Sequence, residues 1–253
     1  MTDRSPAQSF LARHEFLIRR LHSLCGLVPV GAFMVVHLTV NASVLGGAQL
    51  FQSNVDRIHS LGPLLPVVEW AFIFLPLLFH AIFGVVIIAG GVPNTGDYPH
   101  ISNIRYTLQR ATGIVAFFFI VFHVMHMHHY GESLGWGGQF KPDYATSSAG
   151  AAMKSIVIKV AYMIGMLSCV YHLANGLWTM GITWGLWTSP AGQRRANFIC
   201  VGLGIALAVI GLSTMSELGD VDVEKTRKVE ERLYKAREHL QGRGEQAPPA
   251  DEE

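Results

Sequence analysis

The segment PVVEWAFIFLPLLFHAIFGVVIIAG, residues 66–90, decides the fold class of this chain. It is long enough to cross a bilayer, because a transmembrane helix needs about 20 mainly apolar residues. About two-thirds of the way along it lies a histidine, His80. An ionisable side chain at membrane depth costs roughly 3 kcal/mol on insertion scales, so its presence indicates a functional site within the segment.

Four other segments share this length and apolar character. The five candidate spans cover about 23–45, 66–90, 108–130, 156–182 and 197–216. Helices are the expected spanning element, since an open sheet edge in lipid leaves backbone groups unsatisfied. Only 15% of the 253 residues are charged, against about 25% in soluble domains. We therefore expect an all-α membrane protein with five transmembrane helices in one membrane domain, residues 1–216.

Composition excludes several classes of function. The net charge is +1, so no overall electrostatic field favours nucleic acid. The three cysteines are scattered and form no CxxC pair, which argues against an iron–sulfur or zinc site. The chain also lacks the GxGxxG fingerprint of dinucleotide-binding folds.

Four histidines occupy the first four spans, one in each: His37, His80, His123 and His172. Successive helices run in opposite directions, so His37 and His123 should share one depth, and His80 and His172 the other. Each histidine lies a few positions beyond the midpoint of its candidate span, so the two pairs should lie at two different depths in the membrane. This pattern predicts two bis-histidine metal sites, and in a membrane protein we interpret them as haem sites. The first four helices would then form a haem-binding bundle.

Other readings of these histidines remain open. A single intramembrane histidine is often a satisfied structural group, and a metal transporter would need carboxylates on the same path, where only Glu69 qualifies. A haem-free membrane protein is one alternative. Another is a cytochrome b of the quinol–cytochrome c or ascorbate-reducing type.

Small and cationic residues accompany the expected inner site. Gly84 and Gly176 each follow a histidine by four residues and so share its helix face, where a missing side chain admits the edge of a macrocycle. Close helix packing is the alternative explanation. Arg20 and His22, at the inner end of the first span, suit haem propionates or a quinone headgroup because they are cationic donors. His126, one turn after His123, is a candidate to contact an outer propionate or a quinone.

Lysines and arginines in the short connections predict orientation. The side holding the N-terminal arm and the connections 91–110 and 188–196 carries eight of them, and the other side carries three. We expect the N-terminus in the cytoplasm and the C-terminus outside. Residues 217–253 form a charged tail. Its apolar side chains follow helical spacing and predict a short amphipathic helix: Val229, Leu233, Ala236 and Leu240. The last residues, 242–253, are typical of disorder.

The motifs resemble a known family. FLIRRLHSLCGLVPVG (16–31), IFLPLLFHAIFG (73–84), LQRATGI (108–114) and YHLANGLW (171–178) are similar, in this order, to the cytochrome b membrane anchor of succinate dehydrogenase and fumarate reductase. The similarity is greatest to the single-chain, five-helix, two-haem type, and it covers roughly 14–216. It implies that His37 pairs with His123, and His80 with His172, as axial ligands of two haem b groups.

The resemblance also implies partners and a reaction. A flavoprotein subunit carrying FAD would oxidise succinate, and an iron–sulfur subunit would pass electrons to this chain. Quinone, expected to be menaquinone, would accept them near the outer haem, where Asn41, Glu69 and His126 mark the helix ends. The location would be the bacterial cytoplasmic membrane. A quinol:fumarate reductase anchor running in reverse is the alternative.

Overall fold

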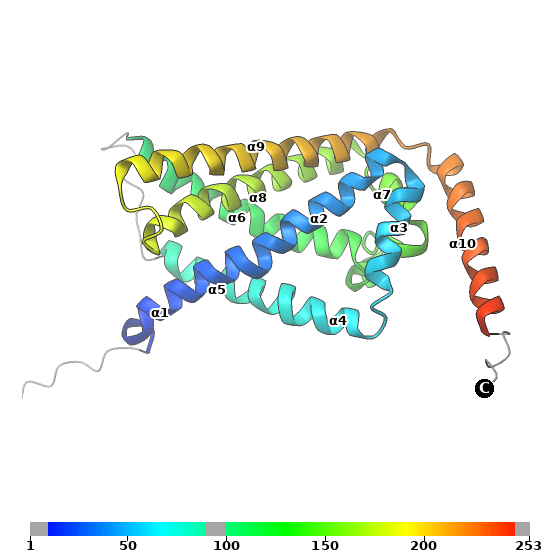
Figure 1. Ribbon diagram of the computed structural model, residues 1–253, viewed down its shortest axis with the longest axis horizontal. Coiled ribbons are helices and arrows are strands. Elements are labelled where there is room, and N and C mark those ends of the chain that lie inside the picture. The colour runs from blue at the N-terminus through cyan, green and yellow to red at the C-terminus, as the bar shows by residue number, and fades with distance from the viewer. Residues whose placement is uncertain (1–9, 90–99, 246–253) are drawn as a thin grey trace, which may run out of the picture. The chain divides into compact units, whose positions relative to one another are not determined.

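The computed structural model describes residues 10–89 and 100–245. All regular elements in this part of the chain are helical, which confirms the all-α prediction. The α-helices (Figure 1) are α1 (Phe10–Cys25), α2 (Ala32–Ala42), α3 (Ala48–His59), α4 (Leu64–Glu69), α5 (Leu75–Ala89), α6 (Ile101–Met127), α7 (Ala145–Ala152), α8 (Ile156–Thr183), α9 (Pro190–Asp220) and α10 (Val223–Glu245). Two short π-helical segments, η1 (Gly26–Gly31) and η3 (Trp70–Phe74), lie between α-helices. Three short 3₁₀-helical segments are η2 (Ser43–Gly46), η4 (His129–Leu134) and η5 (Pro142–Tyr144).

Within these residues, five helical runs are long and apolar enough to cross a membrane, as predicted. They are Arg13–Gly46, Leu64–Ala89, Asn103–Met127, Ile156–Thr183 and Pro190–Asp220. Large apolar side chains on them are widely exposed, for example Phe118 at 67% and Phe198 at 75%. Exposed apolar surface on this scale suits lipid rather than water.

Two of the runs contain a π-helical turn beside a proline. Pro29 lies inside η1, and Pro76 follows η3 by two residues. Proline lacks an N–H and its ring presses on the carbonyl four residues earlier. A π-helical turn lets the helix continue past this obstacle.

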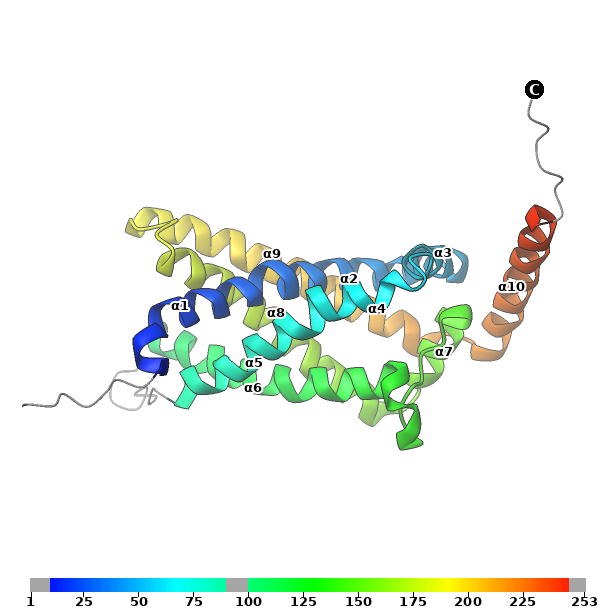
Figure 2. The ribbon, with the colours of Figure 1, turned by 90° about the horizontal axis from the view of Figure 1, so that it is seen from below.

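The chain divides into two compact units. The first contains Met1–Val36, Pro63–Phe118 and Gly165–Ala208, and the second contains His37–Gly62, Phe119–Ile164 and Val209–Glu253. In the described part of the first unit, α1 lies beside α5 (Figures 1 and 2). The first unit therefore holds His80 and His172, and the second holds His37 and His123.

The second unit has its own apolar core and includes the charged tail. Its core side chains come mainly from α3, α7 and the start of α8, with Phe51 1% and Ala145 0% exposed. Helix α10 packs beside α3 and α7 (Figures 1 and 2). It contains the expected amphipathic stretch and also residues 242–245, where the sequence indicated disorder. The rest of that predicted disordered end, 246–253, lies outside the described residues.

Candidate functional site

Two histidines face each other in the first unit. The ring centroids of His80 and His172 lie 6.0 Å apart, and the ring planes make an angle of 86°. His80 Nδ1 lies 2.9 Å from the backbone carbonyl oxygen of His22, and His172 Nδ1 lies 3.0 Å from the backbone carbonyl oxygen of Gln109. A carbonyl oxygen only accepts, so each bond requires a protonated Nδ1. That tautomer leaves Nε2 of both rings available as a metal ligand.

Glycines on neighbouring helices make room for these rings. A Cβ atom at Gly26 would overlap the His80 ring, and one at Gly113 would lie 2.9 Å from His172 Cε1. Neither glycine was a candidate from the sequence, because no local pattern shows which histidine another helix brings opposite it. The family motifs GlyLeuValPro and LeuGlnArgAlaThrGly do contain them.

The two glycines singled out by spacing have other neighbours. A Cβ at Gly84 would meet the His22 ring at 3.7 Å, which is ordinary contact. A Cβ at Gly176 would lie 3.3 Å from Gln109 Nε2. Both glycines thus lie near residues that contact the histidine pair.

The predicted cationic residues occupy the same unit. The His22 ring lies edge-on to His80 with centroids 4.0 Å apart, and its own buried Nδ1 has no hydrogen-bond partner in the described part of the chain. The Arg20 guanidinium lies 5.1 Å from the ring centroids of both Phe16 and Trp184. Stacking of this kind is a common use of arginine beside aromatic rings.

The second unit holds the other pair. The ring centroids of His37 and His123 lie 5.7 Å apart, with an interplanar angle of 78°. His123 Nδ1 is buried without a hydrogen-bond partner among the described residues. Asn41 Nδ2 donates to the carbonyl oxygen of His37 over 2.7 Å, so this predicted residue contacts the segment that carries the ligand.

An aromatic cluster surrounds His123 and includes His126. The Tyr162 ring lies 5.6 Å from that of His123, and the Tyr162 hydroxyl lies 2.8 Å from His126 Nδ1. Phe122 stacks on His126 with centroids 5.2 Å apart. Tyr162 was not a candidate from the sequence, because it lies on another helix. Glu69, the remaining predicted residue, is half-buried at the end of α4 in the first unit.

The geometry fits a metal that takes two protein ligands. Metal–imidazole bonds of about 2.0–2.1 Å place the two ring centroids about 6 Å apart, as in both pairs. In residues 10–89 and 100–245, no group of three or more histidine, cysteine or acidic side chains could hold a metal ion. A bare ion usually needs about four protein ligands. A haem macrocycle supplies four nitrogens itself, so two imidazoles complete its coordination.

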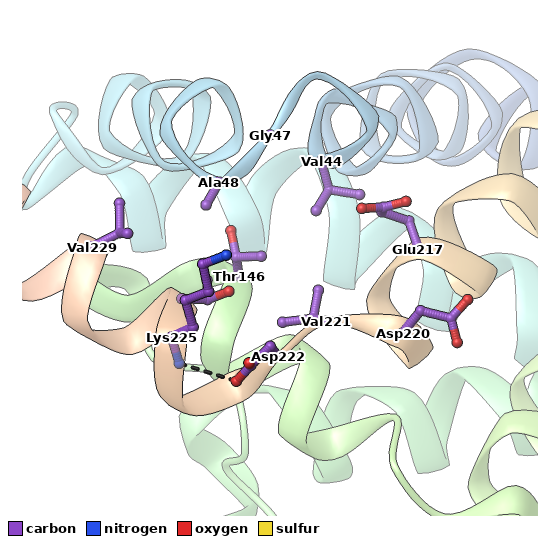
Figure 3. Close-up of a pocket in the computed structure, with 11 residues that line it drawn as sticks. Val44, Gly47, Ala48, Thr146, Glu217, Asp220, Val221, Asp222, Lys225 and Val229 are labelled. Atoms are coloured by element: carbon purple, nitrogen blue, oxygen red, sulfur yellow. Dashed lines mark hydrogen bonds between the residues drawn. The ribbon is translucent and has the colours of Figure 1, made fainter.

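A cavity of about 310 Å³ lies elsewhere in the second unit (Figure 3). Three carboxylates, from the end of α9 and from its connection to α10, lie around it: Glu217, Asp220 and Asp222. Asp222 accepts a hydrogen bond from the backbone N–H of Lys225 over 3.1 Å and so caps α10. No predicted site residue lines this cavity.

Comparison with known proteins decides the family. Residues 93–212 match the model of the succinate dehydrogenase/fumarate reductase transmembrane subunit. The chain is 35% identical over 205 residues to the succinate dehydrogenase cytochrome b558 subunit of Bacillus subtilis (strain 168), covering 79% of this chain and 96% of that protein. The chain belongs to this family. As its transmembrane subunit, it is a multi-pass membrane component of a succinate dehydrogenase complex, as the motifs predicted.

Proposed function

We propose that this subunit anchors the complex to the membrane, binds two haem b groups and carries electrons from an iron–sulfur subunit to quinone. The observation that carries the proposal is the presence of two facing histidine pairs, with centroids 6.0 Å and 5.7 Å apart. The relative from Bacillus subtilis is itself named a cytochrome b558 subunit. His80 and His172 would hold the inner group, and His37 and His123 the outer one.

The protein's own residues would orient the ligands. Haem, when bound, supplies a carrier that takes up and releases one electron. The carbonyl groups of His22 and Gln109 hold the Nδ1 protons of the inner pair, which fixes both the tautomer and the ring orientation. Gly26 and Gly113 leave the space in which these rings stand. Gly84, Gly176, Arg20 and His22 complete the inner surroundings.

The proposed quinone vicinity is the outer site. Asn41 and His126 lie beside the outer ligands through the His37 carbonyl and the Tyr162 hydroxyl, respectively. Glu69 is kept as the third candidate from the sequence. The proposed quinone is menaquinone, and its partners are an FAD flavoprotein and the iron–sulfur subunit. No role with nucleic acid is proposed.

The proposed orientation, N-terminus in the cytoplasm and C-terminus outside, links the reaction to the membrane potential. Electrons would enter from the cytoplasmic side and travel outward. A charge that crosses the full field gains or loses about 2.3 kcal/mol per 100 mV. Reduction of a low-potential quinone would use this contribution. The same arrangement running in reverse, as a quinol:fumarate reductase, is the second candidate, since the family description includes both enzymes.

Purification of the intact complex tests the proposal. An affinity tag on this chain should recover flavin and iron–sulfur subunits, with two b haems for each copy. Succinate should reduce both haems in the absence of other donors. A preparation with one haem or none per chain, or without the two soluble partners, would contradict it.

A further inference from the structure

Two polar side chains, those of Asn175 and Gln109, link Arg105 to His172 in the first unit. Arg105 Nε donates to Asn175 Oδ1 over 2.8 Å, and Asn175 Nδ2 donates to Gln109 Oε1 over 2.8 Å. Gln109 Nε2 in turn donates to the carbonyl oxygen of His172 over 3.1 Å. This chain of bonds therefore joins two of the motif segments, 108–114 and 171–178.

The arginine at its start is held firmly. Its Nη1 donates to Asn197 Oδ1 over 2.9 Å, and its guanidinium lies 3.8 Å from the ring centroid of Trp178. Trp178 is itself fixed, because its Nε1 donates to the carbonyl oxygen of Gln193 over 3.1 Å. Asn175 is only 6% exposed, so water does not replace these partners easily.

The arginine gives the chain of bonds a direction. A guanidinium can donate but cannot accept. Asn175 must therefore turn its oxygen to Arg105 and its nitrogen to Gln109, and Gln109 must turn its oxygen to Asn175. These choices leave the amide nitrogen of Gln109, a donor, facing His172, 3.2 Å from Nδ1.

This direction affects the histidine as a ligand. If Nε2 of His172 were to bind the haem iron, Nδ1 would carry the proton, which it would donate to the backbone carbonyl oxygen of Gln109. A second acceptor beside Nδ1 would draw that proton further away, make the imidazole a stronger electron donor and stabilise ferric iron. The side-chain amide of Gln109 places its nitrogen, a donor, at this position, so Nδ1 has no second acceptor from Gln109.

We infer that Arg105, Asn175 and Gln109 are positioning residues that hold the amide nitrogen of Gln109 beside His172 and thereby keep the reduction potential of the inner haem high. The inference rests on the proposed function, because it requires His172 to be an axial ligand. Its effect should be confined to the inner haem, since all three residues and His172 belong to the first unit.

Matched substitutions of the two asparagines that accept hydrogen bonds from Arg105 test the inference in the purified complex. Asn175→Asp leaves an acceptor facing Gln109 Oε1, so the amide should turn and place its oxygen beside Nδ1. Asn197→Asp places the same negative charge beside Arg105, but residue 197 is not the one that donates to Gln109. A redox titration should show the inner haem shifted to lower potential in N175D, shifted clearly less in N197D, and the outer haem unmoved in both. Gln109→Glu, which puts a carboxylate beside Nδ1 directly, should give the largest shift.

The outcomes separate this inference from the proposed function. His172→Ala, measured in parallel, should remove one haem signal, and its failure to do so would refute the haem assignment and the inference together. If His172→Ala removes the signal but N175D and N197D shift the inner haem equally, the inference alone is overturned. If N175D fails to assemble, the absence of any inner-haem shift in Q109E overturns it in the same way.

Discussion

Glu230 is the test of whether the charged tail is part of the folded second unit. Its side chain is 0% exposed although it lies on α10, a helix rich in charge. Its carboxylate accepts from the backbone N–H groups of Thr146 over 2.7 Å and Ser147 over 3.2 Å. These N–H groups lie in the first turn of α7, where a helix has no internal acceptors. Glu230 therefore caps α7 from another helix.

The hydrogen bonds of Glu230 determine how much its substitution should destabilise α7. Glu230→Ala would leave two buried N–H groups without an acceptor, at about 1–3 kcal/mol each. Glu230→Gln keeps the shape and one acceptor oxygen but loses the attraction between a negative charge and the helix N-terminus, which is worth about 1–2 kcal/mol when buried. Because 1.4 kcal/mol is a factor of ten, we expect E230Q to raise the opening equilibrium of α7 by about 5- to 30-fold.

Hydrogen exchange on the intact protein measures this opening directly, because amide protection reports local as well as global unfolding. Amides of α7 should exchange about 5- to 30-fold faster in E230Q and faster still in E230A. Glu231→Gln is the matched control, since Glu231 is exposed and pairs only loosely with Arg227 at 3.9 Å. Unchanged α7 exchange in E230A, or equal acceleration in E231Q, would refute the capping role.

Two further predictions concern the inner pair and the outer connection. Gly113→Ala places a Cβ 2.9 Å from His172 Cε1, and overpacking of this kind costs about 1–3 kcal/mol. The inner-haem occupancy of this variant, measured in a difference spectrum, should fall. Gly202→Ala, whose added Cβ would have no atom within 4 Å among the described residues, should retain both haems. Burial, with His129 and His59 nearby, lowers the pKa of His128 from 6.5 to about 4. The neutral form is thus favoured by folding, so stability present above pH 6.5 should be lost as the pH falls from 6.5 towards 4. The backbone amides of residues 128–134 should therefore exchange faster as the pH falls through this window, and this acceleration should be smaller in His128→Gln. An equal acceleration in that variant would contradict the prediction.

Much of the fold follows from local sequence. Apolar segments of about 20 residues are sufficient to predict helices in lipid, and all five spans were found by this rule. The facing of His80 with His172 was expected from the alternating direction of successive helices, an argument that needs only depth and no side-chain detail.

The surroundings of the histidines depend on how neighbouring helices are rotated. Gly113 faces His172 and Tyr162 faces His126 because of the rotation of one helix against another. Spacing along one helix carries no such information, so the sequence indicated only glycines on the ligands' own helices, such as Gly84. Glu230 was missed for a related reason. A carboxylate in a charged helix is normally solvated, and the backbone N–H groups that donate to Glu230 lie more than 80 residues away in the sequence.

The pairing of the four histidines is the central claim, and single substitutions with haem spectroscopy test it most directly. In reduced-minus-oxidised spectra and redox titrations of the assembled complex, His37→Ala and His123→Ala should remove the same haem. His80→Ala and His172→Ala should remove the other haem and leave the first intact. Crossed losses, with His37 grouped with His80 or His172, would contradict the account, as would retention of both haems in any of the four variants.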